Sequence, residues 1–565
     1  MIIPGTAQEQ HRVTDNVSFT VKIDGKDVTM DPGGLISLSI GLEVNRIPWA
    51  RMTFSDGSVE KQDFQKSNKD LFSPGKSLEI LLGYSQKQET VFKGIITRHG
   101  IKIQEGRPYR MEIECRDPAA KTSTVKKSRY FYDLADHEIL QEIIKSYPDL
   151  KAGKLKAAGF KHKELVQYQV TDWDFMLLRA DANGMCLNLG DGTLDMFSPE
   201  IKKVADLQVQ FGMGSKGIQL LELESEIDAR DHYADVKGTT WDYTKQELMD
   251  EEAGKTGGVG GGLLSAVAGS VNGAKVKKVF PDVLYKDNPV QLYHGGDLDS
   301  EELNAWVKAK LQRAELSHVR GRVTVAGIKI NPGQTLDLNG VGDRFNGTHF
   351  ITGVMHQMIK GHWRTDIQFG WQREFISEQI QPAENDASGL VAGIKGLHAG
   401  IVSKIEGDER SGNYRVQVRL PFVAVNPNNS ESDGIWARLV NGYAGAGRGL
   451  VFRPEIDDEV IVGFINNDPN DAVILGAVHS DKNAAPEELP MSDKNPKKGF
   501  VSKEGMQLIF DDEKKKIRLS AGGDSSPSIE IDANGSKISI ALDGSNSIEL
   551  SSSGVKINGT RIDLN

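Results

Sequence analysis

The C-terminal segment, residues 505–565, constrains this chain more than any other part of its sequence. Its end reads KISIALDGSNSIELSSSGVKINGTRIDLN, with apolar and polar residues alternating at the two-residue period of a β-strand. Asn534-Gly535, Asp543-Gly544 and Asn558-Gly559 have the chemistry of hairpin turns. The segment therefore predicts short strands with one apolar face, and it contains no helix or second sheet to cover that face.

Two arrangements would bury this face. The segment could form a meander that packs on an upstream domain, although the preceding linker, rich in proline and lysine, argues against such docking. Alternatively, three identical chains could wind about one axis, which buries the apolar faces and leaves no free sheet edge. The side chains that would point inward in this trimer are Ile529, Ile531, Ile538, Ile540, Leu542, Ile548, Leu550, Val555, Ile557, Ile562 and Leu564.

Composition excludes several classes of protein. A chain of 565 residues with 38% hydrophobic and 26% charged residues is typical of soluble multidomain proteins. The net charge of −11 argues against a nucleic-acid partner. Two cysteines, Cys115 and Cys186, cannot form a disulfide framework. We recognise no signal peptide at the N-terminus and no apolar run approaching the roughly 20 residues that span a bilayer.

An internal repeat is visible upstream. Pro74 begins PGKSLEILLG and is followed 18 residues later by Phe92 in FKGIITRHG, and Pro332 in PGQTLDLNG precedes Phe350 in FITGVMHQ by the same distance. Either these are unrelated hairpins with common turn residues, or one β-domain occurs twice. Short strands are predicted over residues 17–120.

Three helices are predicted between the strands. They cover residues 133–147 with Asp133 as a cap, 171–184 with Thr171 as N-cap, and 297–316. A glycine-rich insertion lies near residues 253–275.

A different module follows a polar linker at residues 380–392. About five short strands in residues 393–480 predict a small closed barrel of the OB type. This module has eight Lys and Arg against eleven Asp and Glu, so we expect a structural collar rather than a reader of nucleic acid. A second linker spans 481–499 and the alternating tail spans 500–565.

Motifs of catalysis are absent or incomplete. His137-Glu138 lacks the second histidine of a zinc-protease helix, and we expect it on an exposed helix face. Gly254-Lys255-Thr256 lacks the first glycine of a phosphate loop, and no G-x-S-x-G occurs. The cysteines are expected to pack in the core. The carboxylates of Glu455, Asp457, Asp458 and Glu459 are expected in a turn before a barrel strand. We therefore predict no enzyme activity, no metal site and no cofactor.

Five stretches together resemble VgrG proteins and the fused hub–spike proteins of contractile phage tails and extracellular contractile injection systems. They are VNRIPWARMTFSDG (44–57), FSPGKSLEILLGY with VFKGII (72–96), VTDWDFMLLRADANG (170–184), INPGQTLDLNGVGDRFNGTHFITGVMH (330–356) and GIWARLVNGYAGAGRGLVFRPEIDDEVIVGFINNDPNDAVILGAVHS (434–480). The Pro-Glu-x-x-Asp-Glu-Val core of the last stretch is the most specific.

The resemblance implies a mainly β homotrimer with some helices. Residues 1–380 would form a hub of two similar β-barrel domains, followed by the OB-fold (393–480), the linker (481–499) and an intertwined triangular β-helix spike (500–565). Two like domains in each of three chains would form a pseudo-sixfold ring, which matches a hexameric tube.

The resemblance also implies function and partners. The protein would be the central spike of a contractile injection machine, binding an Hcp-like hexameric tube protein, baseplate proteins, effector cargo and a PAAR-type tip protein at its C-terminus. It would assemble in the bacterial cytoplasm and be driven transiently through a target envelope. The chain ends at Asn565, so we expect no effector domain. The alternative is an enzymatic or glycan-binding phage tail protein.

Overall fold

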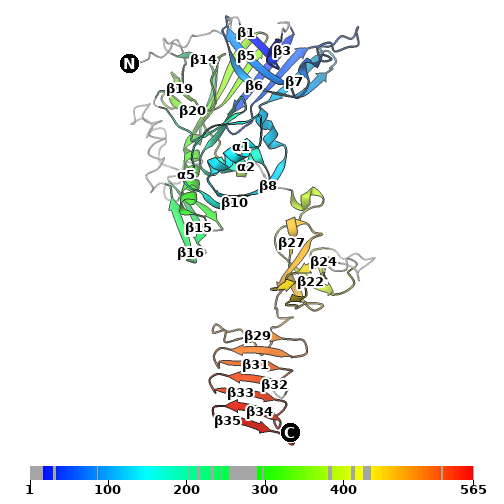
Figure 1. Cartoon of the computed structure of the whole chain (residues 1–565). Coiled ribbons are helices and arrows are strands. Elements are labelled where there is room, and N and C mark those ends of the chain that lie inside the picture. The colour runs from blue at the N-terminus through cyan, green and yellow to red at the C-terminus, as the bar shows by residue number, and fades with distance from the viewer. Residues whose placement is uncertain are drawn as a thin grey trace. The chain divides into compact units, whose positions relative to one another are not determined.

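The chain is mainly β, with few helices (Figure 1). The computed structural model describes residues 17–28, 34–85, 87–202, 204–212, 217–228, 230, 235–242, 245–253, 289–295, 298–379, 385–408, 414–423, 434–523 and 526–563. Most of the glycine-rich insertion, including Gly254-Lys255-Thr256, lies outside these residues. The chain divides into two compact units, Met1–Glu384 and Asn385–Asn565.

One sheet of thirteen strands forms the framework of the first unit. Its N-terminal strands are β1 (Val17–Ile23), β2 (Lys26–Val28), β3 (Leu35–Glu43), β4 (Trp49–Ser55), β5 (Ser77–Tyr84), β6 (Lys87–Lys102) and β7 (Arg110–Arg116). Its other strands are β13 (Leu207–Gln210), β14 (Ile218–Ile227), β18 (Val319–Ala326), β19 (Thr335–Asn339), β20 (Gly347–Ile359) and β21 (His362–Phe369).

The two halves of this sheet have the same strand order. The first half runs β3-β4-β7-β6-β5-β1, and the second runs β14-β18-β21-β20-β19-β13. The second half closes into a barrel because β13 pairs with both β14 and β19. The first half curls around its own apolar core, which includes the fully buried Ile40, Ile80 and Ile113. The halves meet where β20 pairs with β3, so two β-barrels share one continuous sheet.

The repeated Pro-Gly units lie in equivalent places in the two halves. The 18-residue distance from proline to phenylalanine, however, does not lead to equivalent positions. Gly75 N–H donates to Ile96 O over 2.8 Å, and Gly333 N–H donates to Ile351 O over 2.9 Å. Ile96 therefore corresponds to Ile351, and each is followed at once by a β-bulge. The stretch from Gly75 to Ile96, in the β5–β6 hairpin, is three residues longer than the equivalent stretch from Gly333 to Ile351. The equal distances from each proline to Phe92 and to Phe350 therefore join positions that are not equivalent.

The helices lie beside small sheets in the first unit. They are α1 (Asp136–Lys145), α2 (Asp172–Ala182), α5 (Ser300–Ser317) and the short α6 (Ile376–Gln379). The small-sheet strands are β8 (Lys126–Leu134) with β10 (His162–Thr171), β9 (Lys151–Leu155) with β11 (Cys186–Gly190) and β12 (Thr193–Phe197), and β15 (Val236–Asp242) with β16 (Glu247–Glu252) and β17 (Val290–His294).

One predicted helix cap is confirmed and another is wrong. Thr171 caps α2, since its hydroxyl accepts the Asp174 N–H over 3.1 Å. Asp133 does not cap α1, because β8 continues through it to Leu134 and the helix begins after Ala135. The Glu138 carboxylate accepts the Ala135 N–H over 2.9 Å instead.

The second unit contains the predicted OB-type barrel and a ribbon of strands. The closed barrel consists of β22 (His398–Lys404), β23 (Arg415–Arg419), β24 (Ile435–Leu439), β27 (Glu459–Phe464) and β28 (Ala472–Ala477). A small hairpin, β25 (Ala444–Gly445) and β26 (Arg448–Gly449), pairs separately from it. The ribbon consists of β29 (Lys497–Val501), β30 (Gln507–Asp511), β31 (Lys516–Ser520), β32 (Ser528–Asp532), β33 (Lys537–Ala541), β34 (Ser547–Ser551) and β35 (Gly554–Asn558).

None of the helices in the described ranges is long and apolar enough to cross a membrane. Short 3-10 turns complete the described secondary structure at Asp70–Phe72, Pro118–Ser123, Asp386–Gly389 and Ile465–Asn467.

A buried charge cluster ties the helices of the first unit together. Asp136 at the start of α1 is fully buried and accepts from Arg179 Nε over 2.7 Å. Arg179 also donates to Glu302 of α5 over 2.9 Å, and His162 Nε2 lies 3.2 Å from Asp136. Burial alone would raise the pKa of Asp136, but His162 and Arg179 outweigh it and hold the pKa well below its usual range.

We predict that Asp136→Asn lowers the free energy of unfolding of the first unit by about 3 kcal/mol, because it leaves the Arg179 charge buried without its main partner. The folded-state pKa of Asp136 lies below its unfolded value. Its stabilisation is therefore complete above about pH 4 and is lost as the pH falls below that. Thermal unfolding between pH 7 and pH 3 measures both effects. An acid-side loss of stability as steep in Asp136→Asn as in the parent would contradict this assignment.

Both cysteines pack in apolar cores, as the sequence predicts. Cys115 in β7 and Cys186 in β11 are fully buried. Burial raises the pKa of the Cys115 thiol to about 12 and that of Cys186 well above its ordinary value. We expect neither thiol to react with iodoacetamide at pH 8 in the folded protein and both to react in guanidinium, as counted by intact mass. Rapid labelling of the folded protein would show that these cores open.

Candidate assembly surface

The ribbon places its apolar side chains in two cross-strand ladders. Its seven strands are antiparallel, and each pairs only with its neighbours in sequence (Figure 1). Residues directly opposite each other in such pairs lie on the same face. One ladder is Phe510, Ile517, Ile531, Ile538, Leu550 and Val555. The other is Phe500, Leu508, Leu519, Ile529, Ile540, Ile548 and Ile557.

Eight of the eleven predicted core residues belong to these ladders. Leu542 follows β33 in a turn, Ile562 follows β35, and Leu564 lies outside the described residues. Sequence reasoning missed the first members of the ladders, such as Phe500, Phe510 and Ile517, although the same alternation predicts them. The two-residue period determines the face, and the hairpin turns bring each strand back in register.

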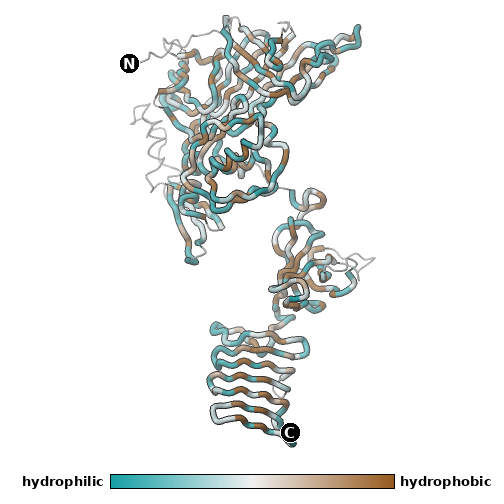
Figure 2. The backbone as a smooth tube through the Cα atoms, viewed as in Figure 1, coloured by the Kyte–Doolittle hydropathy of each residue, from teal (hydrophilic) through white to brown (hydrophobic). Residues whose placement is uncertain are grey.

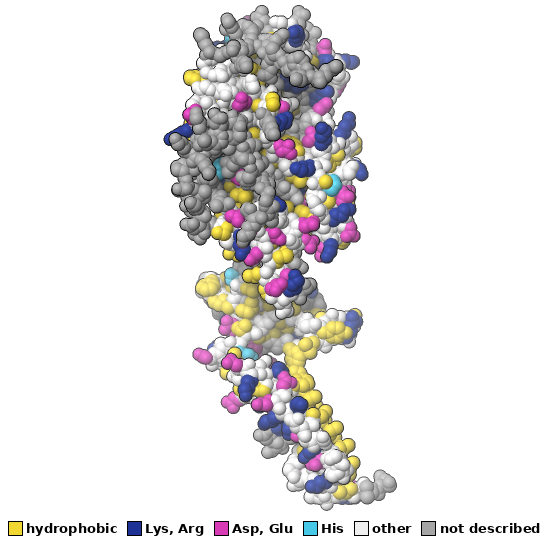
Figure 3. All heavy atoms as spheres, turned by 90° about the vertical axis from the view of Figure 1, so that its left-hand side faces the viewer, with side chains coloured by type: hydrophobic (Ala, Val, Ile, Leu, Met, Phe, Trp, Pro, Cys, Tyr) yellow, Lys and Arg dark blue, Asp and Glu magenta, His cyan; other side chains and the backbone are white. Residues whose placement is uncertain are grey.

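The apolar face is exposed along the whole ribbon. Ile548 is 39% exposed, Ile531 43% and Val555 66%. Hydrophobic residues alternate along each strand in Figure 2, and hydrophobic side chains gather along one side of the tail in Figure 3. Isolated ribbons with a bare apolar face are marginally stable and prone to aggregate. This face therefore requires a partner.

The opposite face of the ribbon is satisfied by its own contacts. Lys516 Nζ lies 2.9 Å from Glu530 and 3.0 Å from Asp532, and Lys537 Nζ lies 2.6 Å from Glu549. The hydrogen bond from Gly535 N–H, together with Lys516, lowers the pKa of Asp532. The charged side chains of this face are thus paired with one another across the strands, whereas the apolar face has no such contacts within the ribbon.

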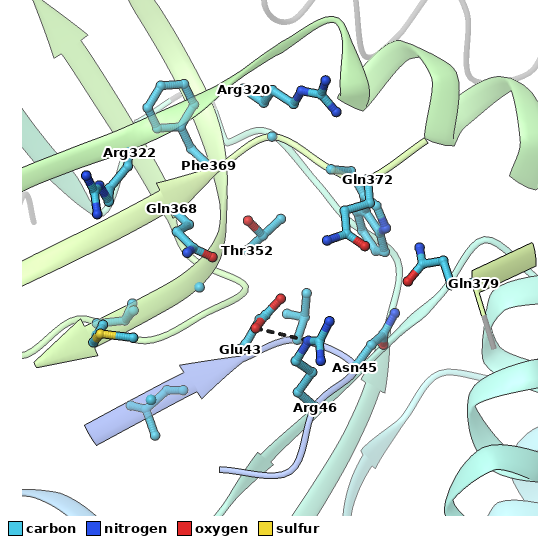
Figure 4. A pocket seen from close by; sticks show the side chains of 18 of the residues that line it. Glu43, Asn45, Arg46, Arg320, Arg322, Thr352, Gln368, Phe369, Gln372 and Gln379 are labelled. Carbon is cyan, nitrogen blue, oxygen red and sulfur yellow. Dashed lines mark ion pairs between the residues drawn. The ribbon is translucent and has the colours of Figure 1, made fainter. Parts of the chain in front are cut away.

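The first unit has a cleft of about 1000 Å³ close to the junction of its two barrels. Figure 4 shows Glu43 and Arg46 within it, with Gln368, Gln372 and Arg320 around them. Burial raises the pKa of Glu43, and Arg46, 3.2 Å away, only partly opposes this. Among the described residues that line the cleft there is no histidine or cysteine.

The other candidate residues from the sequence have structural roles. Asp458 accepts the Glu455 N–H over 2.8 Å, and Asp457 has a φ of 70°, so this cluster forms the predicted turn before β27. His137 in α1 is partly buried rather than fully exposed. Within the described ranges, no group of three or more His, Cys, Asp or Glu side chains could hold a metal ion.

Two family models match the chain. The Alg8 N-terminal domain matches residues 13–360, which is more than half of the chain. The type VI secretion system/phage-baseplate injector OB domain matches residues 398–479, and this range coincides with the closed barrel β22–β28.

Individual relatives are distant and are matched over short regions. The type VI secretion system spike protein VgrG1a of Pseudomonas aeruginosa is 25% identical over 212 residues, which cover 36% of this chain and 33% of that protein. The actin cross-linking toxin VgrG1 of Vibrio cholerae is 36% identical over 76 residues, or 14% of this chain and 7% of that protein. The chain thus spans a third or less of the length of these relatives.

Among solved structures, a tail protein from Neisseria meningitidis has a TM-score of 0.46 at 13% identity, covering 64% of this chain and 98% of that one. A chain of the Francisella PdpA–VgrG complex has a TM-score of 0.41 at 11% identity, covering 94% and 80%. By its matched domain this chain belongs to the Alg8 N-terminal domain family, and its OB domain and its relatives are those of the VgrG spike proteins that its motifs resemble.

Proposed function

We propose that three copies of this chain form the central spike of a contractile injection machine. The observation that carries this proposal is the exposed apolar face of the ribbon, with eleven of its ladder residues between 39% and 50% exposed and a self-sufficient polar face behind it. Three ribbons that turn these faces toward one axis form a closed prism with a dry core and a charged exterior.

Two ribbons packed face to face would also bury the ladders. Three copies are favoured by the rest of the chain, because two barrels in each of three first units make six similar domains. Six domains match the symmetry of a hexameric tube, and a cyclic trimer satisfies closure.

The proposed role is mechanical. The first units bind a hexameric Hcp-like tube protein and baseplate proteins, and the ribbon prism leads to a PAAR-type tip protein. The machine assembles in the bacterial cytoplasm, carries effector cargo, and drives the prism transiently through a target envelope.

We expect light scattering of the purified full-length protein to give three times the 61.9 kDa of one chain. The measurement also separates the proposed trimer from a two-sheet dimer. A folded, soluble monomer at micromolar concentration would overturn the proposed function.

The face of the ribbon is tested by two substitutions at neighbouring residues of β33. Ile540→Lys places a charge in the proposed dry core, so we expect it to abolish the trimer at micromolar concentration. Ser539→Lys places the same charge on the opposite face, between Glu530 and Glu549 in the cross-strand register, and should leave the mass unchanged. Equal effects of the two substitutions would show that the ladders do not form the interface.

A further inference from the structure

A second apolar surface projects from the OB barrel. We call residues 442–453 the arm, which contains the hairpin β25–β26. Ala444 pairs with Gly449, and Leu450 N–H donates to Tyr443 O over 2.7 Å. Every residue of the arm is exposed. Its shape is therefore defined by its own backbone hydrogen bonds rather than by packing on the barrel.

The exposed side chains of the arm are largely apolar. Tyr443 is 56% exposed, Val451 62% and Phe452 56%. Its only charged residues are Arg448 and Arg453, and the Arg448 guanidinium lies over the Tyr443 ring. A two-stranded hairpin has no core of its own, so its apolar surface is stable only against another surface.

The arm continues the apolar face of the ribbon. The Phe452 ring lies 5.5 Å from the ring of Phe500, which is the first member of one ribbon ladder. Beside this contact, Lys503 Nζ lies 3.4 Å from the Glu455 carboxylate. If the ribbon face is an interface between copies, the surface that continues it onto the arm meets the same partner.

Charge identifies which part of that partner the arm fits. The arm has two arginines and no acidic residue, whereas the rest of residues 393–480 has six Lys and Arg against eleven Asp and Glu. The outside of the barrel also presents apolar side chains, with Leu397 65% and Leu475 49% exposed. A cationic, apolar arm and an acidic, partly apolar barrel are complementary surfaces on one chain, the arrangement that closes a ring head to tail.

We propose that the arm of each copy binds the OB barrel of the next copy around the threefold axis. This inference rests on the proposed trimer, but it assigns a second and different interface. The ribbon faces meet at the axis through equivalent surfaces, whereas the arm joins two unlike surfaces.

The test places the photo-crosslinking residue p-benzoylphenylalanine at Leu450 of the full-length protein and mixes isotope-labelled with unlabelled chains before irradiation. The expected result is a native mass of three chains with crosslinks from Leu450 to residues 393–480 of a differently labelled chain. A trimer whose crosslinks stay within one chain would overturn the arm interface and leave the proposed function standing. A monomer would overturn both.

A second measurement uses Val451→Ser with Phe452→Ser, compared with Met491→Ser, which removes a 96% exposed apolar side chain outside the arm. We expect the arm variant to need at least tenfold more protein to stay trimeric and the Met491→Ser variant to match the parent. Salt should weaken the parent trimer more than a variant with Arg448→Gln, since the arm contact is partly ionic. Unchanged dissociation of the arm variant would refute the assignment.

Discussion

An antiparallel ribbon with one apolar face cannot stay alone in water. In this chain the constraint is severe, because the ladders run through all seven strands and the ribbon supplies nothing to cover them. The polar face, with Lys516 and Lys537 paired across strands, needs no partner. The difference between the two faces specifies which side of the ribbon would meet other copies in the proposed trimer.

The first unit contains one strand order twice. Its two barrels use the same strand order and share the β20–β3 seam, so the two copies of the fold are fixed within one sheet. Equivalent bulges after Ile96 and Ile351 show that the correspondence extends to backbone detail. Elsewhere the barrels have diverged, since β1 is antiparallel to β5 whereas β13 is parallel to β19.

In the second unit, the base of the arm is in contact with the first strands of the ribbon. Phe452 on Phe500 and Lys503 beside Glu455 link the base of the arm to the ribbon. With the arm bound to a neighbouring barrel, the trimer would be held by unlike surfaces off the axis as well as by the ladders on it. Such a second contact would hold the three barrels in one register at the point where the prism begins.

The sequence by itself determined the periodic features. The alternation from Ile529 to Ile557 predicted the apolar face, Thr171 predicted the start of α2, and the strand spacing in 393–480 predicted the closed barrel. These signals are local, because the period of a strand and the chemistry of a cap depend only on adjacent residues.

Only the tertiary structure decided the features that depend on contacts between residues distant in the sequence. In the structure Ala135 rather than Asp133 is the cap of α1, because β8 continues through Asp133 beside β10. The structure also showed that Ile96, and not Phe92, is the residue to which the first Pro-Gly unit bonds, as the second unit bonds to Ile351. It also brought Asp136, Arg179 and Glu302 into one buried cluster, and Phe452 into contact with Phe500. These residues are far apart in the sequence, and nothing in the sequence indicates that they are in contact.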